Sequence, residues 1–363
     1  MSKTSYSIAV LPGDGIGTEV MAAALEVLGA VEARIGRRFA LQSYAAGAQH
    51  YADTGVALPE PVLDACRRAD AILFGAMGLP HVRDAQGTEV IPQLDIRFAL
   101  DLYAGVRPIK TWPGLPTPLS DPRASQIDMV LVRENTEGLF YARGRGVIEG
   151  EGENAAAFDT MRISRKGTAR VVDFALRLTE QRHARGRPGL LTNVDKANVF
   201  RSMAFWREVF VERAARFPQI TTEHAYVDAM ALNLVLKPWA YDVLVTENMF
   251  GDILSDLIAS LVGSMGMAPS GDIGDDHGLF QPAHGTAPDI AGRGIANPTA
   301  MILSAAMMLE WLGERHADTA LLDGASLIEA AVHKAFLEQA VRPYDFGGRS
   351  STREIAEAVM ARL

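Results

Sequence analysis

Three aspartates in the second half of the sequence could bind a divalent metal ion. Asp252 and Asp256 lie four residues apart in "ENMFGDILSD", and Asp228, in "HAYVDAM", comes just before the strand expected to lead into that segment. If the segment is helical, both carboxylates project from one face and are close enough to share a cation. Carboxylate ligands without cysteine or histidine favour Mg²⁺ or Mn²⁺. The spacing alone fits two exposed acids on a helix better than it fits a metal site.

Three arginines and a lysine suggest an acidic small-molecule ligand. Arg97 and Arg107 lie ten residues apart in "LDIRFALDLYAGVRP", and Arg133 ends the apolar run in "MVLVRENTEG". Because arginine binds carboxylates bidentately and keeps its charge, three of them near a metal ion predict a pocket for a di- or tricarboxylate. Lys196, in "TNVDKANVF", also follows an apolar run. Positive charge nearby would favour its neutral amine, the form that a general base for a hydroxyl requires. Each of the four, taken singly, also fits a solvated surface position.

A loop rich in glycine, proline and small residues could hold a nucleotide. It reads "PAHGTAPDIAGRGIANPTA" and runs from Pro282 to Ala300. Backbone amides of such a loop can bind phosphate, and Asp289 could accept hydrogen bonds from both ribose hydroxyls. The same carboxylate would repel a 2′-phosphate, which favours NAD over NADP. A tight structural loop before a helix is the alternative.

The glycines near the N-terminus are a weaker candidate for phosphate binding. Gly13, Gly15 and Gly17 in "LPGDGIGTEV" are spaced G-x-G-x-G, whereas the dinucleotide fingerprint is G-x-G-x-x-G. Asp14 also places a negative charge where a pyrophosphate would approach. We therefore expect a tight strand-to-helix turn here.

These candidate residues follow short apolar runs that alternate with helical patterns. The runs span residues 8–11, 71–74, 129–132, 190–194 and 243–245. Strands that alternate with helices predict an α/β architecture whose sites gather at strand ends. The length of 363 residues suggests two domains.

The composition limits the possible partners and compartments. Apolar residues make up 48% and charged residues 22% of the chain, which is typical of a globular protein, and the net charge of −9 argues against nucleic-acid or membrane partners. Cys66 is the only cysteine, which excludes a disulfide framework and a multi-cysteine zinc site. The polar N-terminus and the short apolar run at residues 300–309 predict neither a signal peptide nor a membrane span. We therefore expect a cytoplasmic protein.

Taken together, the motifs resemble those of the metal-dependent β-decarboxylating dehydrogenases, the family of isopropylmalate, isocitrate, homoisocitrate and tartrate/D-malate dehydrogenases. The resemblance runs from "LPGDGIG" through "VRENTEG", "VDKAN" and "NMFGDILSD" to "HGTAPDIAGRGIANP". It implies an α/β, isopropylmalate/isocitrate dehydrogenase-like two-domain fold that is not a Rossmann fold. A large cofactor-binding domain would comprise residues 1–104 and 264–363, and a smaller domain, residues 105–263, would carry the metal and dimer-interface residues. An arm at about residues 144–165 would clasp the two subunits of a homodimer.

The resemblance also assigns roles to individual residues. Arg97, Arg107 and Arg133 would bind the substrate carboxylates, with Val90, Gln93 and Leu94 near the variable substituent. Lys196 would be the base or proton relay at the 2-hydroxyl, supplied across the dimer, and Asp252 and Asp256 would bind Mg²⁺ or Mn²⁺ together with Asp228 of the partner subunit. The NAD contacts would be His284, Gly285, Thr286, Ala287, Asp289, Asn297, Asn198 and Ile16.

One catalytic position departs from the family pattern. The family tyrosine that helps to protonate the enol lies seven residues after the arginine of "VRE", where this chain has Phe140, followed by Tyr141. Adjacent residues point in different directions. We hypothesise that either a local shift brings Tyr141 into the site as the catalytic residue, or oxidation survives while decarboxylation or enol protonation is slowed.

The implied reaction is oxidative decarboxylation of a 2-hydroxy dicarboxylic acid, with 3-isopropylmalate as the best guess. Leu94 fits an aliphatic pocket, whereas Gln93 favours some polarity, so tartrate/D-malate and homoisocitrate/isocitrate remain alternatives. A catalytically weak regulatory or binding subunit of the same fold is an alternative of another class, although the retained acids, arginines and Lys196 argue against it. A Rossmann 2-hydroxy-acid dehydrogenase is disfavoured by the incomplete glycine fingerprint.

Overall fold

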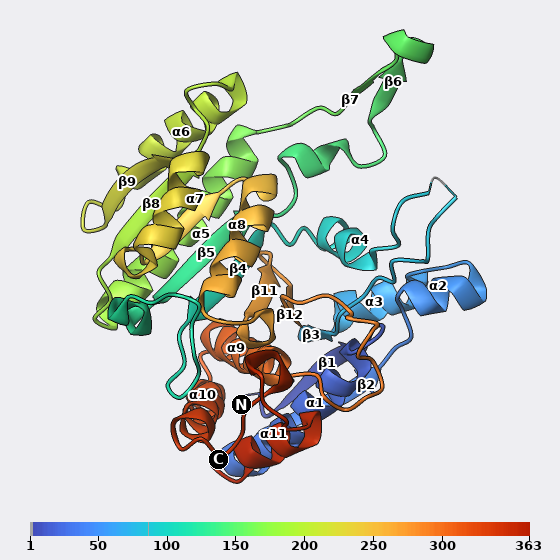
Figure 1. Ribbon diagram of the computed structural model, residues 1–363, viewed down its shortest axis with the longest axis vertical. Coiled ribbons are helices and arrows are strands. Elements are labelled where there is room, and N and C mark those ends of the chain that lie inside the picture. Colours follow the sequence, from blue (N-terminus) through green and yellow to red (C-terminus); the bar gives the residue numbers. More distant parts are fainter. Residues whose placement is uncertain (1–2, 86) are drawn as a thin grey trace. The chain divides into compact units, whose positions relative to one another are not determined.

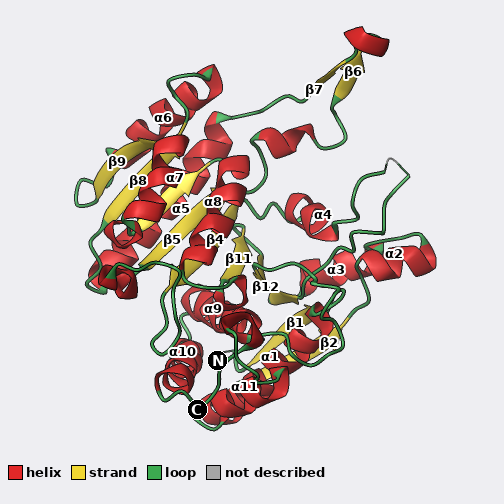
Figure 2. Ribbon diagram, in the orientation of Figure 1, coloured by secondary structure: helices red, strands yellow, loops and turns green. Residues whose placement is uncertain are grey.

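The structure, a computed structural model, describes residues 3–85 and 87–363 and divides into two compact units (Figure 1). Unit 1 comprises Met1–Leu102, Lys110–Ser125 and Ala259–Leu363, and unit 2 comprises Tyr103–Ile109 and Gln126–Ile258. Helices and strands alternate through most of the chain, as Figure 2 shows. The predicted α/β class is therefore confirmed.

Unit 1 contains a mixed sheet in the order β2-β1-β3-β12-β11. Strand β1 pairs in parallel with β2 and β3, β3 pairs in parallel with β12, and β11 runs antiparallel to β12. The strands are β1 (Ser5–Leu11), β2 (Arg38–Ser43), β3 (Ala71–Phe74), β11 (Pro269–Ile273) and β12 (Gly278–Pro282). The helices are α1 (Gly17–Ile35), α2 (Ala48–Thr54), α3 (Glu60–Arg68), α4 (Pro92–Ala99), α9 (Thr299–His316), α10 (Thr319–Leu337) and α11 (Thr352–Met360).

The main core of unit 1 lies around α9. This helix is buried along much of its length because its first turns consist almost entirely of apolar residues, from Ala300 to Leu309. Apolar side chains of α1, α10 and α11 pack in the same cluster. Helix α1 ends at Gly36, whose φ of 63° suits glycine, and α11 begins with a capping box between Ser351 and Glu354.

Unit 2 contains strands in the order β4-β5-β10-β8-β9. The pairs β5–β10, β10–β8 and β8–β9 are all parallel. The strands are β4 (Ala104–Lys110), β5 (Asp128–Glu134), β8 (Leu190–Asp195), β9 (Thr221–Tyr226) and β10 (Val243–Thr246), and the helices are α5 (Arg165–Ala184), α6 (Arg201–Ala214), α7 (Val227–Leu236) and α8 (Asn248–Leu261).

The strand register of unit 2 brings several candidate residues to one edge of its sheet. Thr246 lies opposite Arg133 on one side and opposite Val194 on the other. Because parallel strands end at the same edge, Arg133, the start of α8 and the segment after β8 that holds Lys196 share that edge.

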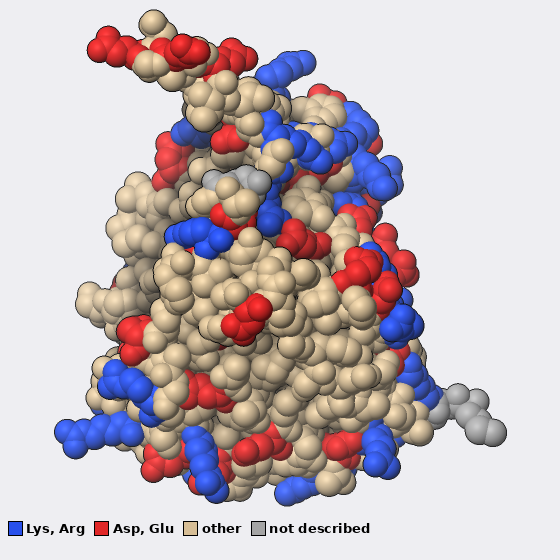
Figure 3. Space-filling model, turned by 90° about the vertical axis from the view of Figure 1, so that its right-hand side faces the viewer, with Lys and Arg blue, Asp and Glu red and all other residues tan. Residues whose placement is uncertain are grey.

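A two-stranded hairpin of β6 (Val147–Glu149) and β7 (Ala156–Phe158) extends away from the helices of unit 2 (Figure 1). Its side chains are exposed, including the apolar Val147, Ile148 and Phe158. Acidic side chains gather at its outer end, where Glu149, Glu151 and Glu153 are exposed (Figure 3).

Within the described residues, no helix combines the length and the apolar character that crossing a bilayer would require.

Candidate active site

The two candidate metal ligands of unit 2 lie one turn apart on α8. Burial, and secondarily the negative charge of Asp252, raise the pKa of Asp256. Ser255 lies between them and donates its hydroxyl to the Asp252 carbonyl at 2.8 Å. A like-charged pair of this kind favours a bound cation. No group of three or more His, Cys, Asp or Glu that could hold a metal occurs in residues 3–85 and 87–363.

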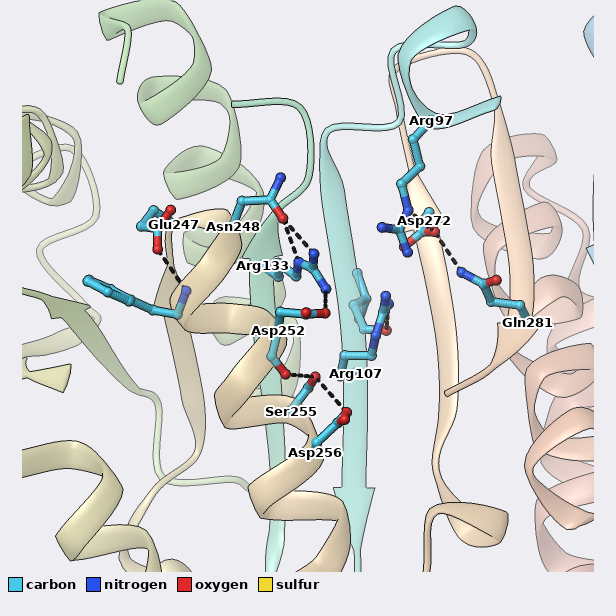
Figure 4. A network of polar contacts seen from close by, with 12 residues as sticks. Arg97, Arg107, Arg133, Glu247, Asn248, Asp252, Ser255, Asp256, Asp272 and Gln281 are labelled. Carbon is cyan, nitrogen blue, oxygen red and sulfur yellow. Dashed lines mark hydrogen bonds and ion pairs between the residues drawn. The ribbon is translucent and has the colours of Figure 1, made fainter. Parts of the chain in front are cut away.

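Arg133 lies directly beside this pair (Figure 4). Its Nε and Nη2 donate to Asn248 Oδ1 at 2.8 and 2.6 Å, and its Nη1 forms an ion pair with Asp252. Gly251 leaves room on α8 for the aliphatic stem of the arginine. The structure thus brings a predicted carboxylate-binding arginine into contact with a predicted metal ligand.

Arg107 belongs to the same region of unit 2. It is buried on β4, and its Nη1 donates to the Val106 carbonyl at 3.2 Å. Its charge, like that of Arg133, acts to lower the pKa of Asp256, although burial outweighs both. Two of the three arginines that were predicted to bind carboxylates therefore lie near Asp252 and Asp256.

Lys196 and Asp228 form a second cluster in unit 2. The Lys196 Nζ lies 2.7 Å from Asp228 Oδ1, and the hydrogen bond from Lys196 lowers the pKa of this carboxyl. Asn198, two residues further on, is exposed. The family resemblance assigned separate roles to Lys196 and Asp228, and the sequence did not predict that they would contact each other.

Sequence reasoning missed the residue that precedes Lys196. Asp195 is fully buried, accepts two hydrogen bonds from Arg207 at 2.8 and 2.7 Å, and accepts a third from the Ala197 amide at 2.9 Å. These contacts fix the backbone on both sides of Lys196. The sequence signal that could have identified Asp195 was a charged residue at the end of an apolar strand.

Phe140 and Tyr141 lie in a short 3₁₀ helix, Leu139–Ala142, and face different partners. The Phe140 ring centre lies 4.9 Å from Arg133 Cζ. The Tyr141 ring instead lies under Arg145 and Arg162, at 3.9 and 5.0 Å from their Cζ atoms. In this structure Phe140, and not Tyr141, packs on Arg133.

The third predicted arginine, Arg97, lies in unit 1 on α4. It is buried, and its Nε donates to Asp272 Oδ2 at 2.8 Å. The neighbouring Val90 and Leu94 are also buried. The Gln93 Oε1 is buried without a hydrogen-bond partner in the described part of the chain, so it can accept from a polar ligand.

The predicted nucleotide segment of unit 1 contacts the glycine turn near the N-terminus. The Ile16 amide donates to the Thr286 carbonyl at 2.9 Å, and the Thr286 hydroxyl donates to the Gly78 carbonyl at 2.7 Å. The Asp14 carboxylate is buried and accepts from the amides of Ala48, Gln49 and Gly78 at 2.7, 2.9 and 3.0 Å. Asp14 therefore joins three backbone segments around Thr286.

Further predicted nucleotide contacts lie nearby in unit 1. Burial lowers the pKa of His284, and its Nε2 has no hydrogen-bond partner within the described residues. Asn297 donates to Asp345 at 3.2 Å, and Ser264 also contacts Asp345. Asp345 was not predicted, because it lies far along the chain from these partners. Gly285 and Asp289 are exposed, and Ala287 has a φ of 37°.

Comparisons with known proteins show what the whole chain is similar to. The model of the family "Isocitrate/isopropylmalate dehydrogenase" matches residues 7–359. A 3-isopropylmalate dehydrogenase of Pseudoalteromonas translucida is 42% identical over 100% of both chains. A 3-isopropylmalate/3-methylmalate dehydrogenase of Methanocaldococcus jannaschii is 41% identical over 99% of both.

Solved structures agree with these sequence matches. The crystal structure of an isocitrate dehydrogenase from Methylococcus capsulatus superposes with a TM-score of 0.86 at 36% identity, covering 98% of this chain and 99% of that one. A β-decarboxylating dehydrogenase from Thermococcus kodakarensis gives a TM-score of 0.78 at 38% identity, covering 98% and 96%.

Proposed function

Since this chain belongs to the isocitrate/isopropylmalate dehydrogenase family, we propose that it catalyses the oxidative decarboxylation of 3-isopropylmalate. It is a dehydrogenase, and enzymes of this family are NAD-dependent decarboxylating oxidoreductases. The observation that carries the proposal is the contact of Arg133 with Asp252, one turn from Asp256, which joins a carboxylate-binding group to a pair of metal ligands.

Asp252 and Asp256 fit a Mg²⁺ or Mn²⁺ ion, because their like charges lie close together and their oxygens are hard ligands. The partner subunit's Asp228 is proposed as a third ligand. When bound, the metal ion would supply a Lewis acid for the 2-hydroxyl oxygen and for the ketone made from it.

Side chains of the protein are proposed to bind the substrate and to transfer its protons. Arg97, Arg107 and Arg133 bind the substrate carboxylates, and Lys196, supplied across the dimer, takes the proton from the 2-hydroxyl. NAD, when bound, would supply the acceptor for the hydride of C2. Loss of the 3-carboxylate as CO₂ and protonation of C3 would complete the reaction, with one NADH and one CO₂ formed per substrate. Tyr141 remains a candidate for the proton transfer to C3. Val90, Gln93 and Leu94 are proposed to contact the substituent on C3.

The cofactor is proposed to bind in unit 1. His284, Gly285, Thr286, Ala287, Asp289, Asn297 and Ile16 would contact NAD there, and Asn198 would lie near the nicotinamide. The bonds that join Ile16 to Thr286 support a single binding surface formed by these two segments. The exposed Asp289 carboxylate supports NAD over NADP because it would repel a 2′-phosphate.

A homodimer with shared active sites follows from the same assignment. Exposed apolar side chains support such an interface, namely Leu232, Val235 and Leu236 on α7, Ile253 on α8, and Val147, Ile148 and Phe158 on the hairpin. Co-expression of Lys196→Gln and Asp252→Asn chains tests it. Each variant alone should be inactive, whereas the mixture should regain about a quarter of wild-type activity, since half the dimers are mixed and each has one intact site. No recovery would contradict shared sites. A cytoplasmic location stays a prediction.

A panel of 2-hydroxy diacids tests the function itself. NADH absorbance and CO₂ release are followed with Mn²⁺ and 3-isopropylmalate, isocitrate, homoisocitrate, D-malate or tartrate, each with NAD and with NADP. We expect the highest kcat/KM with 3-isopropylmalate and NAD. Absence of NADH formation with every diacid of the panel would refute the proposal and favour a regulatory subunit.

The buried Gln93 Oε1 favours one second candidate. An acceptor without a partner fits a substrate hydroxyl better than an alkyl group, so tartrate/D-malate dehydrogenase activity is the alternative. Gln93→Leu should then lower kcat/KM for tartrate and leave that for 3-isopropylmalate unchanged or higher.

A further inference from the structure

The environment of Arg97 in unit 1 contains two polar residues for which neither the sequence nor the family comparison supplied a role. Asp272 on β11 is fully buried and accepts the Arg97 Nε at 2.8 Å. Gln281 on β12 is also buried and donates its Nε2 to the same carboxylate oxygen at 2.9 Å (Figure 4).

The strand register explains why these two side chains meet. β11 and β12 are antiparallel, with Ser270 opposite Gln281 and Asp272 opposite Leu279. Asp272 and Gln281 are therefore diagonal neighbours, two positions out of direct register, and they lie on the same face of the sheet. Both are rigidly placed because they belong to paired strands.

The hydrogen bond to Asp272 leaves the two terminal nitrogens of the Arg97 guanidinium available to a ligand. It uses Nε, the nitrogen nearest the aliphatic stem, and Arg97 makes no other side-chain hydrogen bond within the described residues. Nη1 and Nη2 therefore remain for a carboxylate. A buried guanidinium without a counter-charge is costly, whereas one fixed by a buried aspartate is already desolvated and oriented before a ligand arrives.

We propose that Asp272 and Gln281 are positioning residues for diacid binding: Asp272 orients Arg97, and Gln281 holds the Asp272 carboxylate in the rotamer that does so. Gln281 lies three residues before His284 of the proposed nucleotide segment. The inference rests on the proposed function, because the diacid is the ligand of Arg97.

A thermodynamic cycle tests whether Asp272 acts through Arg97. Asp272→Asn, Arg97→Gln and the double variant are compared with the wild-type enzyme for KM, for kcat and, by calorimetry, for diacid binding. Asp272→Asn should raise the KM for the diacid roughly tenfold or more, with a smaller change in kcat and none in the KM for NAD. In the Arg97→Gln background it should have no further effect.

A second arginine–aspartate pair of unit 1, with a buried aspartate and a partly buried arginine, provides the control. Asp318 accepts from Arg37 Nε and Nη2 at 2.6 and 2.8 Å and lies outside the proposed site. Asp318→Asn should lower the thermal midpoint and leave every KM unchanged. If Asp272→Asn fails to fold, Gln281→Leu replaces it and should produce a smaller rise in the same KM.

An unchanged diacid KM in the folded Asp272→Asn enzyme, or effects of the two substitutions that simply add, would overturn the inference alone. A wild-type enzyme that binds the diacid but does not oxidise it would overturn the proposed function, while the binding data still test the cycle. A wild-type enzyme that binds no diacid would overturn both.

Discussion

Replacement of Arg133 by glutamine should strengthen the binding of Mn²⁺ in the absence of substrate. The Arg133 Nη1 occupies the Asp252 carboxylate, which is proposed as a metal ligand. A cation that takes this carboxylate must displace the guanidinium. Arg133 would remain held by its two hydrogen bonds to Asn248.

The size of the effect follows from the exposure of the pair. The Arg133 side chain is 4% exposed, but that of Asp252 is 53% exposed and well screened by water. An ion pair of this kind contributes at most about 1 kcal/mol. Its loss should therefore lower the Kd for Mn²⁺ by up to roughly fivefold.

Calorimetry or the electron paramagnetic resonance of free Mn²⁺ measures this Kd at fixed ionic strength without diacid. Arg107→Gln is the matched control, because it removes another positive charge that acts on the aspartate pair. We expect the Kd to fall further in Arg133→Gln than in Arg107→Gln. Equal or weaker binding in Arg133→Gln would refute the competition between the arginine and the metal ion.

Three further predictions concern the acid at C3, pH and the N-terminal turn. Phe140→Tyr should raise CO₂ release relative to NADH formation if the phenyl ring on Arg133 slows decarboxylation, whereas Tyr141→Phe should slow turnover if Tyr141 shifts into the site. If Tyr141→Phe is fully active and wild-type CO₂ release already matches NADH, both versions are wrong. Burial raises the pKa of Glu134 from 4.5 to about 7. Because the native state then holds a proton that the unfolded state has released, the free energy of unfolding should fall as pH rises from 4.5 to about 7, and Glu134→Gln should flatten this slope in urea titrations at several pH values. Asp14→Ala removes the acceptor of three backbone amides and should lower the free energy of unfolding by about 3 kcal/mol and raise the KM for NAD; a urea midpoint equal to that of the wild-type protein would contradict this assignment.

The fold class could be predicted because its signals are local. Several predicted strands are runs of apolar residues that are buried on both faces, such as β3 and β10, and such runs are visible without knowledge of their neighbours. Parallel strands then place Arg133 and the segment of Lys196 at one edge without further information. The family was recognised for the same reason, since its motifs are short and follow these strands, and the family match confirms it.

The glycine turn near the N-terminus shows that local sequence signals do not reveal contacts between distant segments. The spacing of its glycines argued against a phosphate loop but gave no reason for the glycines themselves. Gly13 has a φ of 83°, and a side chain there would collide with the Ala76 carbonyl. Asp14, which looked unfavourable for a phosphate, instead binds the Ala48, Gln49 and Gly78 amides. These partners lie 34 to 64 residues away, so no window of sequence contains them.

The counter-ions of the arginines could not be predicted for the same reason, because they lie far away along the chain. These counter-ions affect how the arginines bind substrate. A buried arginine needs a negative charge when no substrate is bound. Arg97 obtains it from Asp272, which is fully buried, whereas Arg133 obtains it from Asp252, which is half exposed and a proposed metal ligand. The first pair contains no proposed metal ligand and should persist when the diacid binds. The second should open when a cation binds Asp252, so that the contact of Arg133 with Asp252 is exchanged for one with a substrate carboxylate only after the metal ion has bound.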